Sequence, residues 1–162
     1  YPDSYIIYKP HPDTESGLRS KGKEDQSIIL HADLIAYKTS LEDLFNNVDK
    51  IAVFTSLGGF EALIRGISVI TYGLPFYAGW GLTEDKLHNH IWAKRRTKRL
   101  SIEELTYIAL VKYPFYSSVK FNCLTEIENI IVEISSLNMN RNLEQIIFKY
   151  WGILKDRFLR NP

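Results

Sequence analysis

Short apolar runs alternate with helix-like patterns along the first half of the chain. The runs occupy residues 5–8, 28–36, 51–54 and 69–72. Most of them carry β-branched Ile or Val at the centre, as buried strands do. Between them, the pattern predicts helices over residues 41–48 and 57–64. This alternation indicates an α/β fold with a doubly wound, Rossmann-like parallel sheet.

The ends of both predicted helices carry suitable capping residues. Ser40 is suited to cap the first helix, and Glu42 and Asp43 would lie in its first turn, where the helix dipole favours negative charge. Gly66 is suited to end the second helix, because glycine readily adopts the left-handed conformation found there.

The sequence after residue 100 shows three helical patterns and no convincing strand. Ser101 and Glu104 have the spacing of a capping box, and Pro114 would stop that helix. Two further amphipathic patterns cover about residues 124–137 and 143–159. We therefore predict a Rossmann-like domain over residues 1–100 and a C-terminal helical segment over residues 101–162 that packs on the same domain.

The composition excludes several functional classes. With 45% apolar and 24% charged residues, the 162-residue chain is typical of a soluble globular domain. A net charge of +1 gives no electrostatic reason to expect a nucleic-acid partner. The single cysteine, Cys123, can form neither an internal disulfide nor a thiolate zinc cluster. His31, His88 and His90 lack partners at ligand spacing, so we predict no metal site.

The chain carries no targeting or membrane signal that would place it outside a reducing compartment. It has no apolar stretch of the roughly 20 residues that span a bilayer, and no signal-peptide pattern. It also lacks an initiator methionine and enters a strand-like run almost at once. We expect a fragment of a longer cytoplasmic protein.

The first candidate for chemistry directly follows the first apolar run. In Lys9-Pro10-His11-Pro12, the two prolines restrict the backbone and would hold the imidazole at the end of the strand. A histidine fixed there can donate a hydrogen bond to a phosphate, and Lys9 can add positive charge. The alternative is a turn histidine that bonds only the backbone.

The second candidate lies where the third apolar run meets the next helix. The hydroxyls of Thr55 and Ser56 and the amides around Gly58 and Gly59 would face the same sheet edge as His11. An ordinary Ser N-cap with a glycine turn explains the same residues about as well. The spacing matches neither the P-loop nor the dinucleotide fingerprint.

Three further features have both a structural and a functional interpretation. Glu61, near the start of that helix, would either cap it or hydrogen-bond sugar hydroxyls. The loop over residues 73–85 is either a packed connection or a shaped surface whose half-exposed aromatics stack on a sugar or base. The basic run over residues 94–99 is read first as a solvated connector and second as a patch for phosphate or anionic lipid.

Three long strings carry a family resemblance. They read YKPHPDTESGLRSKG, TSLGGFEALIRGISVITYGLPFYAGWGLTED and RRTKRLSIEELTYIALVKYP. They closely resemble bacterial capsule polysaccharide biosynthesis and export proteins that act as β-Kdo transferases. The resemblance covers residues 5 to about 116 and weakens in the C-terminal helices. It implies one half of a GT-B glycosyltransferase fold, with residues 1–100 as the half that binds the donor, CMP-Kdo.

The resemblance also implies roles for individual residues. Two groups of residues would hold the cytidylate phosphate. The first consists of Lys9, His11 and Pro12, and the second of Thr55 and Ser56 with the amides of Gly58 and Gly59. Glu61 would bind the ribose, and the loop residues Tyr77, Gly79, Trp80 and Gly81 would line the donor site. His11 would stabilise the leaving phosphate, and no metal or cofactor is needed for that step.

The family further implies partners and a location. Its members add Kdo to a phosphatidylglycerol-Kdo acceptor in Gram-negative bacteria, at the inner face of the cytoplasmic membrane, before the capsule polymer is exported. The acceptor-binding half is expected to lie outside this chain, which would then bind donor without completing the reaction. Two alternatives stay open. One is a non-catalytic module that contacts the capsule export machinery through residues 94–99. The other is a different sugar-nucleotide enzyme, such as a sialyltransferase or an epimerase-like GT-B protein.

Overall fold

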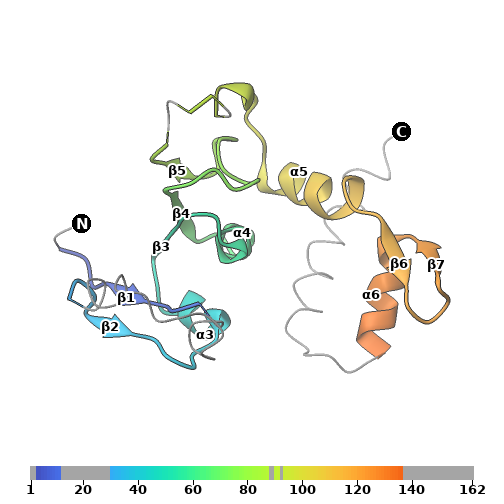
Figure 1. Cartoon of the computed structure of the whole chain (residues 1–162), viewed down its shortest axis with the longest axis horizontal. Helices are drawn as coiled ribbons and strands as arrows, with labels where there is room; N and C mark the ends of the chain where they lie inside the picture. The colour runs from blue at the N-terminus through green and yellow to red at the C-terminus, as the bar shows by residue number, and fades with distance from the viewer. Residues whose placement is uncertain (1–2, 12–29, 88–89, 92, 137–162) are drawn as a thin grey trace. The chain divides into compact units, whose positions relative to one another are not determined.

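The computed structural model describes residues 3–11, 30–87, 90–91 and 93–136 (Figure 1). The chain divides into two compact units, Tyr1–Val48 and Asp49–Pro162. Each unit is described by itself. The assignment of domains to residues 1–100 and 101–162 stays a prediction.

The first unit contains a short parallel strand pair and one helix. Its elements are β1 (Ile7–Tyr8), β2 (Leu34–Ile35) and α3 (Leu41–Phe45). The backbone N–H of Ile6 donates to the carboxylate of Asp33 at 2.7 Å, which ties the two strands together where they begin. Ser40 caps α3 as predicted, because its hydroxyl accepts from the amide of Asp43 at 3.0 Å. The helix ends at Phe45, earlier than the pattern predicts.

The second unit is built on a parallel three-stranded sheet. Its strands are β3 (Lys50–Val53), β4 (Ser68–Thr71) and β5 (Glu84–Asp85), in the order β3-β4-β5. The helix α4 (Leu57–Ile64) connects β3 to β4. Apolar side chains of α4 and β4 form the core, and the buried ones include Phe60, Ala62, Ile64, Val69 and Ile70. The predicted α/β fold with parallel strands is therefore confirmed, whereas the doubly wound arrangement stays a prediction.

The ends of α4 match the sequence prediction closely. Ser56 caps its start. At its other end Arg65 is the C-cap, and the next residue, Gly66, has a φ of 79°. A side chain at that φ would strain the backbone, so glycine is the residue that lets the chain turn here into β4.

The C-terminal part of the second unit contains a hairpin that the pattern does not predict. The capping box of Ser101 and Glu104 is present at the start of α5 (Ile102–Tyr107), which continues into the π-helical segment η2 (Ile108–Lys112). The antiparallel strands β6 (Tyr116–Ser118) and β7 (Cys123–Thr125) follow, and α6 (Ile127–Ser136) comes last. The expectation of no strand after residue 100 is wrong, because these strands are too short to show alternation.

A buried side chain explains why the hairpin forms there. The hydroxyl of Ser118 donates to the carboxylate of Glu133 in α6 at 2.6 Å and accepts from the amide of Phe121 at 3.1 Å. The Ser118 hydrogen bond, followed by one from the amide of Lys120, holds the pKa of Glu133 below its usual value. The predicted helix over 143–159 lies outside the described residues. Within the described helices, none is both long and apolar enough to cross a membrane.

Candidate functional site

The turn between β3 and α4 is closed by Ser56. Its hydroxyl accepts a hydrogen bond from the amide of Gly58 at 3.2 Å, and its backbone carbonyl accepts from the amide of Gly59 at 3.1 Å. The predicted N-cap is thus present, and two of the amides predicted to receive an anion already take part in the turn. The side chains of Thr55 and Ser56 are exposed at the carboxyl end of β3.

Tyr77 supports this turn from the interior of the unit. Its ring is completely buried, and its hydroxyl donates a short hydrogen bond to the backbone carbonyl of Ser56. Burial raises the pKa of Tyr77 to about 12, because the phenolate would lose its hydration. Of the two interpretations of the loop, the packed connection is therefore the one that holds for Tyr77, and the half-exposed surface does not.

The position of Tyr77 also explains one of the glycines of the turn. A Cβ on Gly59 would lie 2.2 Å from the hydroxyl oxygen of Tyr77. The Tyr77 ring packs edge-on against Phe76 at 5.2 Å between ring centroids, and Phe60 packs edge-on against Phe76 at 4.9 Å. The turn and the aromatic loop are therefore parts of one packed structure.

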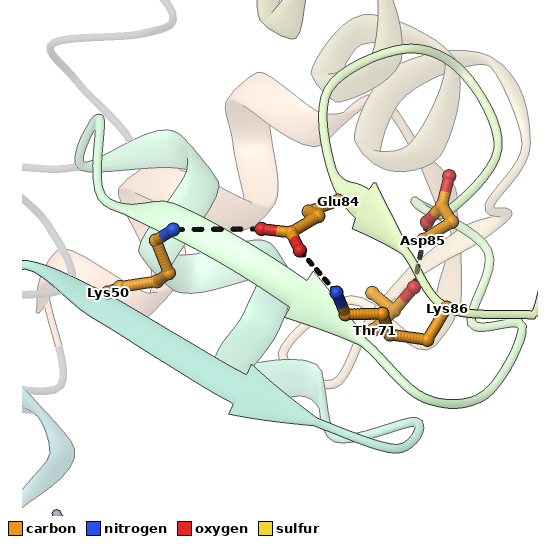
Figure 2. Close-up of polar contacts among 5 residues, drawn as sticks. All are labelled: Lys50, Thr71, Glu84, Asp85 and Lys86. Carbon is orange, nitrogen blue, oxygen red and sulfur yellow. Dashed lines mark hydrogen bonds and ion pairs between the residues drawn. The ribbon is translucent and has the colours of Figure 1, made fainter. Parts of the chain in front are cut away.

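Asp85 fixes the far end of the aromatic loop to the sheet. One carboxylate oxygen accepts from the hydroxyls of Thr71 at 2.7 Å and Thr83 at 2.6 Å, and the other accepts from the amide of Gly79 at 3.0 Å. Thr71 is fully buried in β4, and Figure 2 shows its contact with Asp85. The sequence interpretation does not single out Asp85, although Asp side chains commonly accept from backbone N–H groups nearby in the sequence.

Figure 2 also shows a charged cluster formed by residues of β3, of β5 and of the position just after β5. Glu84 of β5 lies 3.6 Å from the ammonium group of Lys50 in β3 and 2.5 Å from that of Lys86. These side chains are more than one third exposed, so each ion pair contributes little to stability. The cluster lies beside the Asp85 contact and takes no part in it.

Arg96 holds the middle of the loop. Its guanidinium donates to the backbone carbonyls of Pro75 and Ala78, each at 2.6 Å, and lies 5.6 Å from the centre of the Trp80 ring. The indole N–H of Trp80 donates to the carbonyl of Phe76 at 2.7 Å. The interpretation of residues 94–99 as a solvated connector is therefore wrong for Arg96, which is half-buried against the loop.

Two loop glycines have the conformation that this packing requires. Gly79 and Gly81 have φ values of 81° and 82°, which side chains rarely adopt. A Cβ on Gly79 would lie 3.0 Å from Arg96, and one on Gly81 would lie 3.3 Å from Arg99. Both glycines therefore allow the basic residues to lie close against the loop.

The other predicted phosphate-binding residues belong to the first unit. Lys9 is half-buried, Pro10 is buried and His11 is exposed, directly after β1. Pro12 lies outside the described residues. The prediction that this group and the turn at Ser56 bind one phosphate stays a prediction.

Glu61 is half-buried on α4. Its backbone carbonyl accepts from the guanidinium of Arg65 at 3.2 Å. The role of its carboxylate in binding a sugar stays a prediction. Within the described residues, no group of three or more His, Cys, Asp or Glu side chains could hold a metal ion.

The turn and the loop both lie within the residues that match a known protein family. The model of the family described as capsule polysaccharide biosynthesis protein matches residues 1–116. The capsule polysaccharide modification protein LipA of Neisseria meningitidis serogroup A is 41% identical over 142 residues, which are 87% of this chain and 20% of LipA. The lipopolysaccharide-processing protein LpsZ of Rhizobium meliloti is 36% identical over 134 residues, 83% of this chain and 30% of LpsZ.

Two solved structures of Thermosulfurimonas dismutans KpsC are similar to the chain. The β-Kdo 2,7 transferase is 39% identical with a TM-score of 0.71, and the match covers 85% of this chain and 43% of that one. The β-Kdo 2,4 transferase is 31% identical with a TM-score of 0.65, and the match covers 82% of this chain and 40% of that one. The chain thus spans less than half the length of each of these relatives. With the turn, the loop and its Arg96 contact all inside the matched residues, the chain belongs to the capsule polysaccharide biosynthesis protein family of KpsC.

Proposed function

We propose that this chain is the donor-binding part of a β-Kdo transferase, one half of a GT-B fold that holds CMP-Kdo. The observation that carries the proposal is the similarity to the two KpsC Kdo transferase structures. In this proposal the remainder of the longer relatives would bind the lipid-linked acceptor, phosphatidylglycerol-Kdo. The chain by itself would bind donor and transfer no sugar.

The geometry of the turn supports a role in stabilising the leaving nucleotide. When the bond between Kdo and CMP breaks, negative charge develops on the phosphate, and fixed hydrogen-bond donors lower the energy of that state. Thr55 and Ser56 offer exposed hydroxyls at the carboxyl end of a parallel strand, where such ligands bind. Tyr77 and Gly59 pack beneath the turn, so its donors would need little reorganisation.

The remaining site residues have separate roles in the proposal. His11 and Lys9 would contribute a hydrogen bond and positive charge to the same phosphate, and Glu61 would bind the ribose hydroxyls. Gly79, Trp80 and Gly81 would form the wall beside the sugar, held in place by Arg96 and Asp85. None of these roles needs a metal ion.

Calorimetry with CMP tests the proposal. Thr55→Val keeps the size of the side chain and removes its hydroxyl, and unlike a Ser56 variant it leaves the helix cap intact. A hydrogen bond to a charged group contributes about 1.5–3 kcal/mol, so we expect Thr55→Val and His11→Ala each to weaken CMP binding about tenfold or more.

The matched control is His31→Ala, which removes another exposed histidine of the first unit and should bind CMP like wild type. Equal affinity of wild type and His11→Ala would contradict the proposed phosphate site. Tighter binding of UDP than of CMP would favour an epimerase-like enzyme. A preference for CMP-sialic acid over CMP-Kdo would favour a sialyltransferase.

The structure gives less support to the alternative of a docking module for the export machinery. That alternative uses residues 94–99 as the contact surface, but Arg96 already binds two backbone carbonyls of the aromatic loop. Replacing it would disturb the loop as well as any partner contact.

A further inference from the structure

Two aromatic side chains stand exposed where β3 and β4 end. Phe54 directly follows β3 and is 73% exposed, and Tyr72 directly follows β4 and is 43% exposed. Their ring centroids are 5.9 Å apart, with an angle of 41° between the ring planes. Exposing two large rings side by side loses the free energy that their burial would give, so the pair calls for an explanation.

The backbone beneath these rings is held firmly. The amide of Tyr72 donates to the carbonyl of Val53 at 2.8 Å, which extends the parallel pairing beyond the strands. A Cβ on Gly73 would lie 2.7 Å from the carbonyl oxygen of Phe54. The two strand ends that carry the rings are therefore packed as closely as glycine allows.

The pair adjoins the proposed phosphate-binding turn. Phe54 is followed directly by Thr55, whose methyl group would lie 3.0 Å from a Cβ on Gly73. A nucleotide joins an anionic phosphate to a planar base, and this edge of the sheet offers hydroxyls and aromatic rings in successive residues. Bases stack on aromatic side chains in many nucleotide-binding sites.

We propose that Phe54 and Tyr72 form a platform on which the base of the bound nucleotide stacks. This inference rests on the proposed function, because it assigns the base of the same donor. The two rings are too close and too tilted to admit a base between them, since stacking on both faces needs rings about 7 Å apart. The base therefore lies on the outside of the pair.

A stacking platform has a distinctive specificity. Every base presents a π-face, so stacking is tolerant of base identity. The platform would strengthen binding of CMP and UMP alike and would leave ribose 5-phosphate, which has no base, unaffected. Discrimination between bases would have to come from other residues.

The test is calorimetry on the full 162-residue chain with CMP, UMP and ribose 5-phosphate. Phe54→Leu and Tyr72→Leu keep an apolar side chain and remove the ring, and circular dichroism verifies that each variant folds. We expect both variants to lose roughly fivefold to a hundredfold in affinity for CMP and UMP, with ribose 5-phosphate binding unchanged. Tyr72→Phe keeps the ring and should therefore keep the CMP affinity of the wild type.

The control is Phe115→Leu, which removes a ring that is 92% exposed and lies just before β6. Wild-type affinity for CMP in both the Phe54→Leu and the Tyr72→Leu variant would overturn the platform and leave the proposed function standing. A parallel loss of ribose 5-phosphate affinity would also overturn it, because it would show that the rings shape the turn instead of binding the base. Absence of CMP binding by wild type would reject the proposed function, and the platform with it.

Discussion

Single residues in the second unit carry more than one structural task. Ser56 caps α4 with its hydroxyl, closes the turn with its carbonyl and receives the Tyr77 hydroxyl on the same carbonyl. Position 59 requires glycine because the side chain of Tyr77 occupies the space where a Cβ would be. The turn therefore depends on Tyr77, which lies 21 positions after Ser56 in the sequence.

The raised pKa of Tyr77 predicts a pH-dependent contribution to stability. Its pKa is about 12 in the folded chain against a usual value of 10.0, because burial disfavours the phenolate. The neutral form is thus retained in the folded state over a range where the unfolded chain already ionises. The contribution of Tyr77 to the free energy of unfolding is complete below pH 10 and is lost as the pH rises from 10 to 12.

Tyr77→Phe isolates this effect in urea unfolding measured by circular dichroism. Loss of the hydrogen bond should lower the free energy of unfolding by about 1 kcal/mol at neutral pH. The difference between wild type and variant should shrink above pH 10. A difference that stays constant to pH 12 would contradict the buried-phenol interpretation.

At the scale of elements, two side chains hold the aromatic loop after β4, namely Asp85 at its end and Arg96 from beyond it. Asp85 of β5 binds the loop amide of Gly79 and the buried hydroxyl of Thr71, and Arg96 binds two loop carbonyls. Through these contacts the loop is a fixed part of the second unit. In the proposed donor site, such a rigid wall would reduce the entropy lost on binding.

Asp85→Asn tests the role of this carboxylate. An amide carries no negative charge, so the hydrogen bonds that remain are weaker, and an amide whose nitrogen faces Gly79 cannot accept from its N–H at all. We expect faster hydrogen exchange at the Gly79 amide and a free energy of unfolding lower by about 1–3 kcal/mol.

Glu84→Gln is the matched control for this variant. It changes the neighbouring carboxylate, which makes only partly exposed ion pairs with Lys50 and Lys86. It should change stability by less than about 1 kcal/mol and leave Gly79 exchange unaltered. Equal effects of the two variants on stability and on Gly79 exchange would show that the hydrogen bonds of Asp85 do not hold the loop.

At the scale of the molecule, the residues that the proposal assigns to the phosphate come from two separate stretches of the sequence. Lys9 and His11 belong to the first unit, and the turn and loop belong to the second. We predict that CMP protects backbone amides after β1 and in the turn after β3 in a single saturable step, measured by hydrogen exchange at increasing CMP. His11→Ala should abolish the protection in both places. Protection confined to the second unit would show that His11 and Lys9 take no part.

The sequence predicts the local features of this fold better than the distant ones. The caps at Ser40, Ser56 and Ser101 follow from contacts within three residues, so the side chain and its partner appear in one short pattern. The contacts of Arg96 with Pro75 and of Ser118 with Glu133 join residues 21 and 15 positions apart. Their partners are a backbone carbonyl and a side chain on another element, which no local pattern reveals. For this reason the sequence pattern predicts neither the hairpin nor the role of Arg96.

The two-point attachment of the aromatic loop limits how this protein could be altered. Asp85 and Arg96 form hydrogen bonds with backbone atoms of Gly79, Pro75 and Ala78. These hydrogen bonds fix the number of residues between those atoms. An inserted or deleted residue there would shift every later partner out of register, whereas a changed side chain at Phe76 would alter only its ring contacts with Phe60 and Tyr77. Redesign of this loop would therefore proceed through substitutions at fixed loop length.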